Sequence, residues 1–226
     1  MLNSKFITFE GGEGSGKSTQ SKMLLEELQK RGIQAICTRE IGGTNEAEKI
    51  RSLIMNSNFY NISELLLIMA ARYEHLNKVI IPSLVRGIWV ICDRYIDSTA
   101  AYQTTNSNLE VKKIYELHEE LINISCDHPD KELFDKYIQT YNSPIAKGLP
   151  DKTFFLDVSP KAGLKRAHNR GGTNKFEDKS FVFHQKVYNN FKLLSKKIDR
   201  INFIDCNGED IYHVHRKIVS SLDLNH

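Results

Sequence analysis

The chain has 226 residues, and 40% of them are hydrophobic, which is enough apolar material for a sizeable core. Its formal net charge of +3 is too small to indicate a nucleic-acid-binding surface by itself. The longest uninterrupted apolar run, Leu65 to Ala71, is far shorter than the roughly 20 residues that a membrane span needs.

Short β-rich runs alternate with longer helical patterns along the chain. This alternation predicts an α/β fold with a doubly wound, five-stranded parallel sheet. No Pro/Ser-rich linker or change in composition divides the chain, so we expect a single domain over residues 1–226. The predicted strands are Phe6–Phe9, Ala35–Thr38, Ile88–Cys92, Thr153–Asp157 and Asn202–Asp205.

Three helices have recognisable ends. The first runs from Lys17 to about Arg31 and is followed by Gly32, which suits a left-handed C-terminal cap. A long helix is expected over about 63–86, with Pro82 bending its last turn. A third begins at Ser159-Pro160, an N-cap followed by a first-turn proline, and runs through Asn169.

Two segments lie outside this regular pattern. Residues 173–178 are polar and stand between two helices, so we predict a mobile lid over about 166–178. Residues 125–148 form an unassigned insertion, which we interpret as an added surface element with a short helix over about 129–141.

The cysteines favour a reducing compartment. Cys37, Cys92, Cys126 and Cys206 are widely separated and form no C-x-x-C pair, so neither a zinc site nor a disulfide framework is indicated. No signal-like segment precedes the first expected strand. We therefore expect reduced thiols and a cytoplasmic location.

The most informative motif follows the first predicted strand. Residues 11–18 match G-x-x-x-x-G-K-S, in which backbone N–H groups and a helix N-terminus surround phosphates and Lys17 adds a cation. Ser18 would hold Mg²⁺, and Asp93, at the end of another apolar strand, would orient this ion. The predicted ATP-binding residues are Gly11, Gly12, Glu13, Gly14, Ser15, Gly16, Lys17, Ser18 and Thr19.

Several ordered motifs together resemble bacterial thymidylate kinases over nearly the whole chain. They are residues 9–20, Thr38-Arg39-Glu40 with Gly42-Gly43-Thr44, Ala71-Arg72, Asp93 through Gln103, 149–151 and 164–167. The resemblance implies transfer of the γ-phosphoryl group of ATP to dTMP, giving dTDP and ADP, for dTTP synthesis and DNA replication. It also implies Mg²⁺ as cofactor and a homodimer packed through helices on one side of the sheet.

The same resemblance implies an acceptor site. Arg51 and Arg94 would bind the monophosphate, Arg72 the thymine edge, and Tyr102 would lie beneath the sugar and favour deoxyribose. The predicted dTMP-binding residues are Glu13, Glu40, Arg51, Ile68, Arg72, Arg94, Ser98, Thr99, Tyr102 and Gln103.

Phosphoryl transfer requires cations around the moving group. Members of the resembled family place an extra transfer-site arginine either in the phosphate loop or in the lid, and the variable loop position here is Ser15. The lid candidate is therefore Arg170, with Arg166 near the donor nucleotide. Lys17, Arg94 and Arg170 are the predicted catalytic residues.

Three positions depart from the resembled pattern. Ile68 replaces a phenylalanine that stacks on thymine, which predicts a raised KM for dTMP. Ile41 replaces a proline that follows a cis bond, which predicts a trans Glu40–Ile41 peptide. The segment Asn174-Lys175-Phe176-Glu177 stands where an Asp-Arg pair is usual, and Lys175 keeps the charge but lacks the planar fork of arginine.

Two alternatives remain open at this point. One is a P-loop kinase for another nucleotide or nucleoside, since a missing methyl group is discriminated only about 10 to 200-fold and dUMP would retain some activity. The other is a nucleotide-hydrolysing switch, because residues 174–177 faintly resemble a guanine-reading N-K-x-D motif, although they end in Glu and follow no apolar strand.

Overall fold

The computed structural model describes residues 4–105, 107–124, 131–140, 147–171, 175–222 and 224. Its centre is a five-stranded sheet in the order β2-β3-β1-β4-β5, and every neighbouring pair of strands is parallel. The strands are β1 (Phe6–Glu10), β2 (Ala35–Arg39), β3 (Trp89–Asp93), β4 (Lys152–Asp157) and β5 (Ile201–Asp205). The predicted parallel sheet is confirmed, and each predicted strand is present with small differences at its ends.

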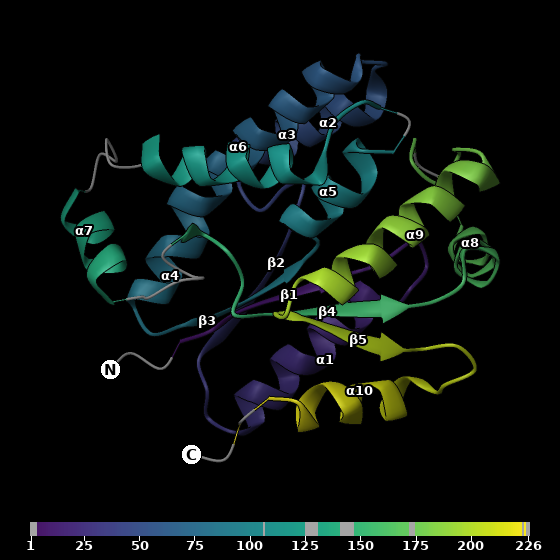
Figure 1. Ribbon diagram of the computed structural model, residues 1–226. Helices are drawn as coiled ribbons and strands as arrows, with labels where there is room; N and C mark the ends of the chain where they lie inside the picture. The colour runs from purple at the N-terminus through teal and green to yellow at the C-terminus, as the bar shows by residue number, and fades with distance from the viewer. Residues whose placement is uncertain are drawn as a thin grey trace.

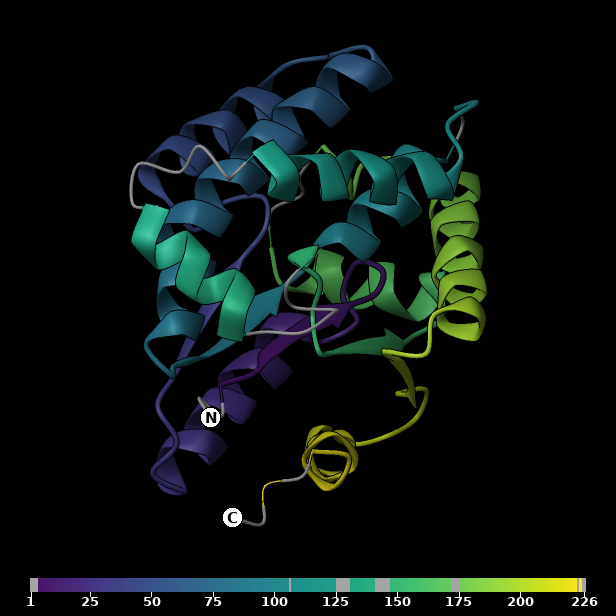
Figure 2. The same ribbon diagram turned by 60° about the vertical axis from the view of Figure 1, so that its left-hand side comes forward.

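Helices cover both faces of this sheet. On one face lie α1 (Lys17–Lys30) and α10 (Ile211–Ser220), below the strands in Figure 1 and in the turned view of Figure 2. The other helices are α2 (Asn45–Asn56), α3 (Asn61–His75), α4 (Ile81–Val85), α5 (Ile96–Gln103), α6 (Val111–Ile124), α7 (Lys131–Thr140), α8 (Pro160–Asn169) and α9 (Phe181–Lys197). Of these, α8 lies beyond the carboxyl end of β4 (Figure 1).

Alternation along the strands produces two cores. On β1, Phe6 faces a core shared with α3, α4, α5 and α9, whereas Ile7 and Phe9 face a second core shared with α1 and α10. Because successive side chains of a strand point to opposite faces, one apolar strand supplies both cores. This arrangement buries the central strands, and the candidate active site lies at their carboxyl ends.

The helix predictions hold with one exception. Gly32 adopts φ 74° after α1, and Ser159 caps α8 by accepting a hydrogen bond from the Ala162 N–H. The long helix is interrupted earlier than predicted, by the π-helical turn η1 (Leu76–Ile80), in which Ile81 N–H donates to the Leu76 carbonyl. Pro82 then lies in the first turn of α4, where its missing N–H matters least, so it does not bend a last turn.

The remaining segment predictions fall partly on undescribed residues. The short helix expected over about 129–141 is α7, which is described over 131–140. Residues 125–130 and 141–146 of the insertion, residues 172–174 of the lid, and Cys126 lie outside the described residues. Cys37, Cys92 and Cys206 are free thiols. Within the described part of the chain, none of the helices combines the length and apolar character that crossing a bilayer requires.

Candidate active site

The phosphate loop connects the end of β1 to the start of α1. Gly14 has φ +65°, and a methyl group there would lie 2.0 Å from the carbonyl oxygen of Gly163 in α8. A methyl group on Gly163 would in turn lie 2.2 Å from the Glu13 carbonyl oxygen. Two glycines therefore permit direct backbone contact between the loop and α8.

The ammonium group of Lys17 lies inside the loop. Its Nζ donates to the Gly12 carbonyl at 2.8 Å and to Ser15 Oγ at 3.2 Å. Burial lowers the pKa of Lys17 to about 8, against the raising influence of Asp93 and Glu13. Nucleotide phosphates would supply the missing negative charge, so the residue is arranged to bind an anion.

Ser18 and Asp93 meet across the sheet edge. Ser18 Oγ, on the first turn of α1, donates a hydrogen bond to Asp93 Oδ2 at the end of β3. A hydroxyl and a carboxylate are hard oxygen donors of the kind that Mg²⁺ prefers, and Mg²⁺ usually keeps waters and phosphate oxygens as its other ligands. The donor set therefore fits the predicted metal.

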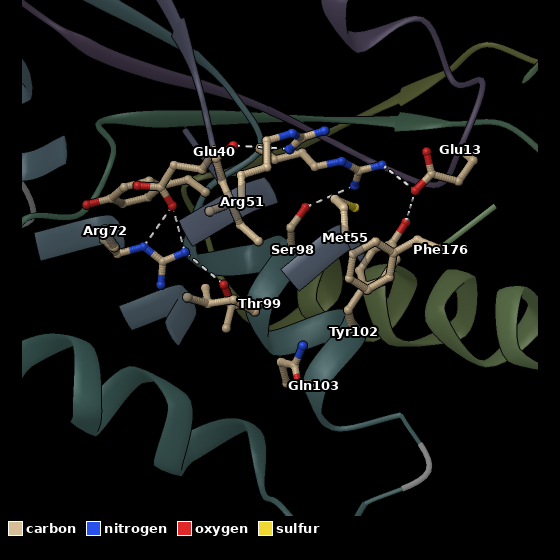
Figure 3. A pocket seen from close by; sticks show the side chains of 14 residues that line it. Glu13, Glu40, Arg51, Met55, Arg72, Ser98, Thr99, Tyr102, Gln103 and Phe176 are labelled. Carbon is tan, nitrogen blue, oxygen red and sulfur yellow. Dashed lines mark hydrogen bonds and ion pairs between the residues drawn. The ribbon is translucent and has the colours of Figure 1, made fainter. Parts of the chain in front are cut away.

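Arg94 joins the phosphate loop to α5. Its Nη1 donates to the Gly11 carbonyl at 2.9 Å and to Ser98 Oγ at 3.1 Å, and its Nη2 pairs with Glu13 Oε1 at 2.9 Å. Glu13 Oε1 also accepts from the Tyr102 hydroxyl at 2.9 Å, as Figure 3 shows. Burial would raise the pKa of Glu13, but the charges of Arg94 and Lys17 lower it to about 2, so Glu13 remains a carboxylate.

A second carboxyl group is linked to Arg94 through the hydroxyl of Ser98. Glu10, the last residue of β1, is buried and accepts hydrogen bonds from the Tyr95 N–H at 2.8 Å and from Ser98 Oγ at 2.5 Å. Burial and then the charge of Asp97 raise the pKa of Glu10 to about 8. Sequence reasoning missed this residue, although an acidic residue directly before the glycine loop, inside an apolar strand, was a usable signal.

Arg72 is the most deeply buried cation of the site, with a side-chain exposure of 1%. Its Nε and Nη2 lie 2.8 and 2.7 Å from Glu40 Oε2, and Nη2 also donates to Thr99 Oγ1 at 2.7 Å. His75 Nδ1 lies 3.1 Å from the other oxygen of Glu40. Burial opposes ionisation of Glu40, but Arg72 and His75 lower its pKa, so the Arg72–Glu40 ion pair is retained in the interior.

One pocket is lined by Glu13, Glu40, Arg72 and Arg94. In Figure 3 the cluster of Arg72, Glu40 and Thr99 and the pair of Glu13 and Tyr102 stand on opposite sides of it. Every residue predicted for dTMP binding lines this pocket, together with four that were not predicted for it: Ile41, Met55, Tyr95 and Phe176. The structure thus brings the predicted acceptor residues together beside the phosphate loop.

Comparison with known proteins identifies the family. Residues 9–143 and 136–218 match the family model described as thymidylate kinase. The thymidylate kinase of Rickettsia bellii strain RML369-C is 42% identical over 220 residues, covering 97% of this chain and 96% of that protein. The thymidylate kinase of Orientia tsutsugamushi strain Ikeda is 44% identical over 211 residues, covering 91% and 86%.

A solved structure agrees. The crystal structure of thymidylate kinase from Ehrlichia chaffeensis matches with a TM-score of 0.72 at 31% identity and covers 97% of this chain and 99% of that one. The chain belongs to the thymidylate kinase family. The resemblance found in the motifs is therefore confirmed, and with it the assignment as a nucleoside monophosphate kinase.

One predicted departure from the thymidylate kinase family is wrong. The Glu40–Ile41 peptide bond is cis, although residue 41 is not proline. The trans prediction used only the local preference of the bond, whereas long-range contacts hold the residues on both sides. Glu40 is bound by Arg72 and His75, and Arg51 Nη1 donates to the Ile41 carbonyl at 3.1 Å.

The two predicted lid arginines lie away from the acceptor pocket. Arg170 follows α8 with a side chain that is 63% exposed, and its Nη2 pairs with Glu177 Oε1 at 3.0 Å. Arg166 is exposed on α8. Neither lines the acceptor pocket. Their roles in the thymidylate kinase reaction remain predictions.

Proposed function

We propose that the protein transfers the γ-phosphoryl group of ATP to dTMP, giving dTDP and ADP, with the residue roles described below. The observation that carries the proposal is the position of Arg94. Its guanidinium contacts the phosphate loop through Gly11 and Glu13 and also lines the pocket that holds the predicted acceptor residues. One cation would therefore adjoin both the donor and the acceptor phosphates.

At the donor end, the loop from Gly11 to Thr19 would bind the ATP phosphates. Lys17 would place its charge on them, because its present partners are an uncharged carbonyl and a hydroxyl. Ser18 and Asp93 would hold Mg²⁺, which would supply charge neutralisation on the nucleotide phosphates when bound. Arg166 would lie near the rest of the donor nucleotide.

At the acceptor end, Arg51 and Arg94 would bind the monophosphate of dTMP. Arg51 lines the pocket, and burial followed by the charge of Arg39 lowers its pKa. A dianionic phosphate would relieve both effects by giving the guanidinium a charge partner. A monophosphate bound at this end of the pocket would give a function to both arginines.

The nucleoside would extend from this phosphate toward Arg72. Tyr102 lies against Arg94, whose guanidinium is 5.2 Å from its ring centroid, and its hydroxyl is held by Glu13. That fixed ring would crowd a 2′-hydroxyl. Arg72, Thr99 and Gln103 would bind the base, and the aliphatic Ile68 would contact its face. Because one methyl group in an apolar pocket is discriminated only about 10 to 200-fold, we expect measurable turnover of dUMP.

Chemistry would depend on positioning and charge, since the transition state of phosphoryl transfer is loose and its charge is spread over the moving group. Lys17 and Arg94 would approach that group from the two sides. Arg170 would add a third cation when the lid segment moves its exposed side chain toward the phosphates.

The setting of the enzyme follows from the same proposal. A kinase that uses ATP to make a precursor of dTTP would act in the cytoplasm. We also propose a homodimer packed through helices on one side of the sheet, because Leu53 of α2 and Ile62 and Leu66 of α3 expose 47%, 52% and 58% of their surface.

The test is ADP release from ATP and Mg²⁺ with a panel of acceptors, with dTMP and dUMP side by side and direct detection of the diphosphate. Rapid ADP formation that requires dTMP is expected, and Lys17→Met should abolish it. Turnover with a different acceptor alone would refute the dTMP assignment. Slow hydrolysis that ignores every acceptor would instead support a nucleotide-dependent switch.

A further inference from the structure

A second cavity adjoins the acceptor pocket. It shares Tyr102, Gln103 and Phe176 with that pocket and is lined in addition by Glu64 and Lys175. Gln103 therefore stands between the two spaces, at the end of α5. The residues that bind the Gln103 side chain in the second cavity therefore determine which atom of its carboxamide faces a base in the acceptor pocket.

Lys175 enters this cavity from the lid segment. Its ammonium group donates to the carbonyl oxygens of Ile54 and Ser57 at 3.2 and 2.8 Å and to Glu64 Oε2 at 2.7 Å. An ammonium group has three N–H donors, so these three acceptors satisfy it fully. The departure from the family pattern at Lys175 thus has a local explanation, since a compact ammonium suits this site at the end of α2.

Glu64 connects Lys175 to Gln103. Its Oε2 pairs with Lys175, and its Oε1 accepts from Gln103 Nε2 at 2.9 Å. The side chains of Lys175 and Glu64 are only 13% and 12% exposed, so little water competes for these contacts. A carboxylate can only accept hydrogen bonds, so it requires the nitrogen side of the Gln103 carboxamide.

We propose that Glu64 and Lys175 are positioning residues that set the base specificity of the acceptor pocket by fixing which way the Gln103 carboxamide faces. This inference rests on the proposed function, in which Gln103 binds the base of a pyrimidine nucleotide. With Nε2 committed to Glu64, the Gln103 carbonyl oxygen is the acceptor available to a ligand. Thymine and uracil carry an N3–H that can donate to it.

Cytosine presents the opposite pattern, because its N3 is an acceptor and its N4 amino group is a donor. At N3, where the Gln103 oxygen accepts from thymine, a hydrogen bond to cytosine would require the carboxamide to rotate by half a turn and place its oxygen against the Glu64 carboxylate. Two acceptors would then face each other in a poorly hydrated cavity. The pair of Glu64 and Lys175 therefore selects against cytosine as well as for thymine and uracil.

The arrangement also links base recognition to the lid. Lys175 lies in the lid segment, and the neighbouring Phe176 lines the acceptor pocket. When the lid segment contacts α2 and α3 through Lys175, the same contact neutralises Glu64 and supports its bond to Gln103. Discrimination among pyrimidines is thus strongest with this segment in place.

The test compares the KM and kcat for dTMP with the inhibition constant of dCMP against dTMP turnover. Glu64→Gln keeps the shape of the side chain but lets it donate as well as accept, so Gln103 is free to rotate. We expect Glu64→Gln and Lys175→Met to lower the preference for dTMP over dCMP by about tenfold or more. The KM for dTMP should rise more than kcat falls, and the KM for ATP should stay unchanged.

Two controls separate this role from a general effect on the fold. Lys179→Met removes a lysine of the same cavity whose side chain makes no hydrogen bond or ion pair with the described residues, and it should leave the preference unchanged. Lys175→Arg can still donate to Glu64 and should retain most of the preference. If Glu64→Gln and Lys175→Met lower turnover of dTMP and binding of dCMP equally, with a lowered melting temperature, the residues are structural and the inference is wrong.

Failure of the inference can be told apart from failure of the proposed function. Absence of dTMP turnover in the unmodified protein would overturn the proposed function itself. Normal dTMP turnover in the unmodified protein, with an unchanged preference in Glu64→Gln, would overturn the role of Glu64 and Lys175 alone.

Discussion

The acceptor side and the lid side of the site are built differently. Arg72 and Arg94 are held by Glu40 and Glu13, and their side chains are 1% and 19% exposed. Arg170 is 63% exposed and pairs with Glu177, whose side chain is only 4% exposed. The acceptor cations are therefore preorganised by the fold, whereas the side chain of the lid cation lies mostly in solvent. We therefore expect replacements on the lid side to affect mainly kcat, and replacements on the acceptor side to affect mainly the free energy of unfolding.

Replacement of Arg170 offers the largest contrast. If it is the transfer-site cation, Arg170→Ala should lower kcat about 10³-fold, the lower end of the effect of such arginines. The free energy of unfolding should fall by about 1 kcal/mol, less than for a fully buried pair, because Arg170 is exposed although its partner Glu177 is not. Steady-state kinetics and urea denaturation would measure the two quantities. Lys165→Ala, on the same helix, is the control, and a loss of kcat below about tenfold would place the transfer cation elsewhere.

The acceptor side should show the reverse. Glu40→Gln leaves Arg72 buried without a charge partner, which should lower the free energy of unfolding by about 3 kcal/mol. The matched control is Glu48→Gln, which removes a pair with Arg39 that is about half exposed and should cost less than about 1 kcal/mol. Urea denaturation of both variants at pH 7 would decide. Equal losses of unfolding free energy in the two variants would show that the buried Arg72–Glu40 pair contributes no more to stability than an exposed pair.

The pH dependence of the two substrates should also differ. Burial lowers the pKa of Lys17 to about 8 in the free protein, and bound phosphates would raise it, so ATP binding takes up a proton above that pH. The KM for ATP should therefore rise above pH 8, by up to about tenfold per pH unit. The KM for dTMP should change less, because Arg51 and Arg94 do not titrate in this range. A flat profile for ATP from pH 7 to 9.5 would contradict the assignment of Lys17.

The smallest effect is expected inside the acceptor pocket. Ile68→Phe would restore an aromatic face against the base, and the KM for dTMP should fall by up to about tenfold. Ile68→Leu keeps an aliphatic side chain of the same size and serves as the control. Initial-rate measurements over a range of dTMP concentrations would test this. An unchanged KM in Ile68→Phe would show that Ile68 does not face the base.

Much of this site could be predicted because its information is local. The loop from Gly11 to Ser18 and the run from Asp93 to Gln103 are continuous segments, and both follow strands whose apolar pattern is clear in the sequence. Parallel strands place their carboxyl ends at one edge, so these segments had to meet there. The alternation of apolar patterns likewise predicted the succession of strands and helices along the chain, but not the order of the strands within the sheet.

What was missed depends on contacts between distant segments. Phe176 and Met55 line the pocket from the lid segment and from α2, and nothing in their own neighbourhoods distinguishes them from ordinary apolar residues. The cis Glu40–Ile41 bond was missed because a local preference was weighed without the contacts of Glu40 and Arg51. The bond between Glu64 and Gln103 likewise joins two helices whose relative positions no local pattern specifies.

The backbone contact of Gly14 with Gly163 has a mechanical consequence. Because the two segments touch without side chains between them, a tilt of α8 would be passed directly to the backbone of the phosphate loop. A tilt that carried Arg166 and Arg170 inward would therefore also shift the loop that we propose binds the donor phosphates.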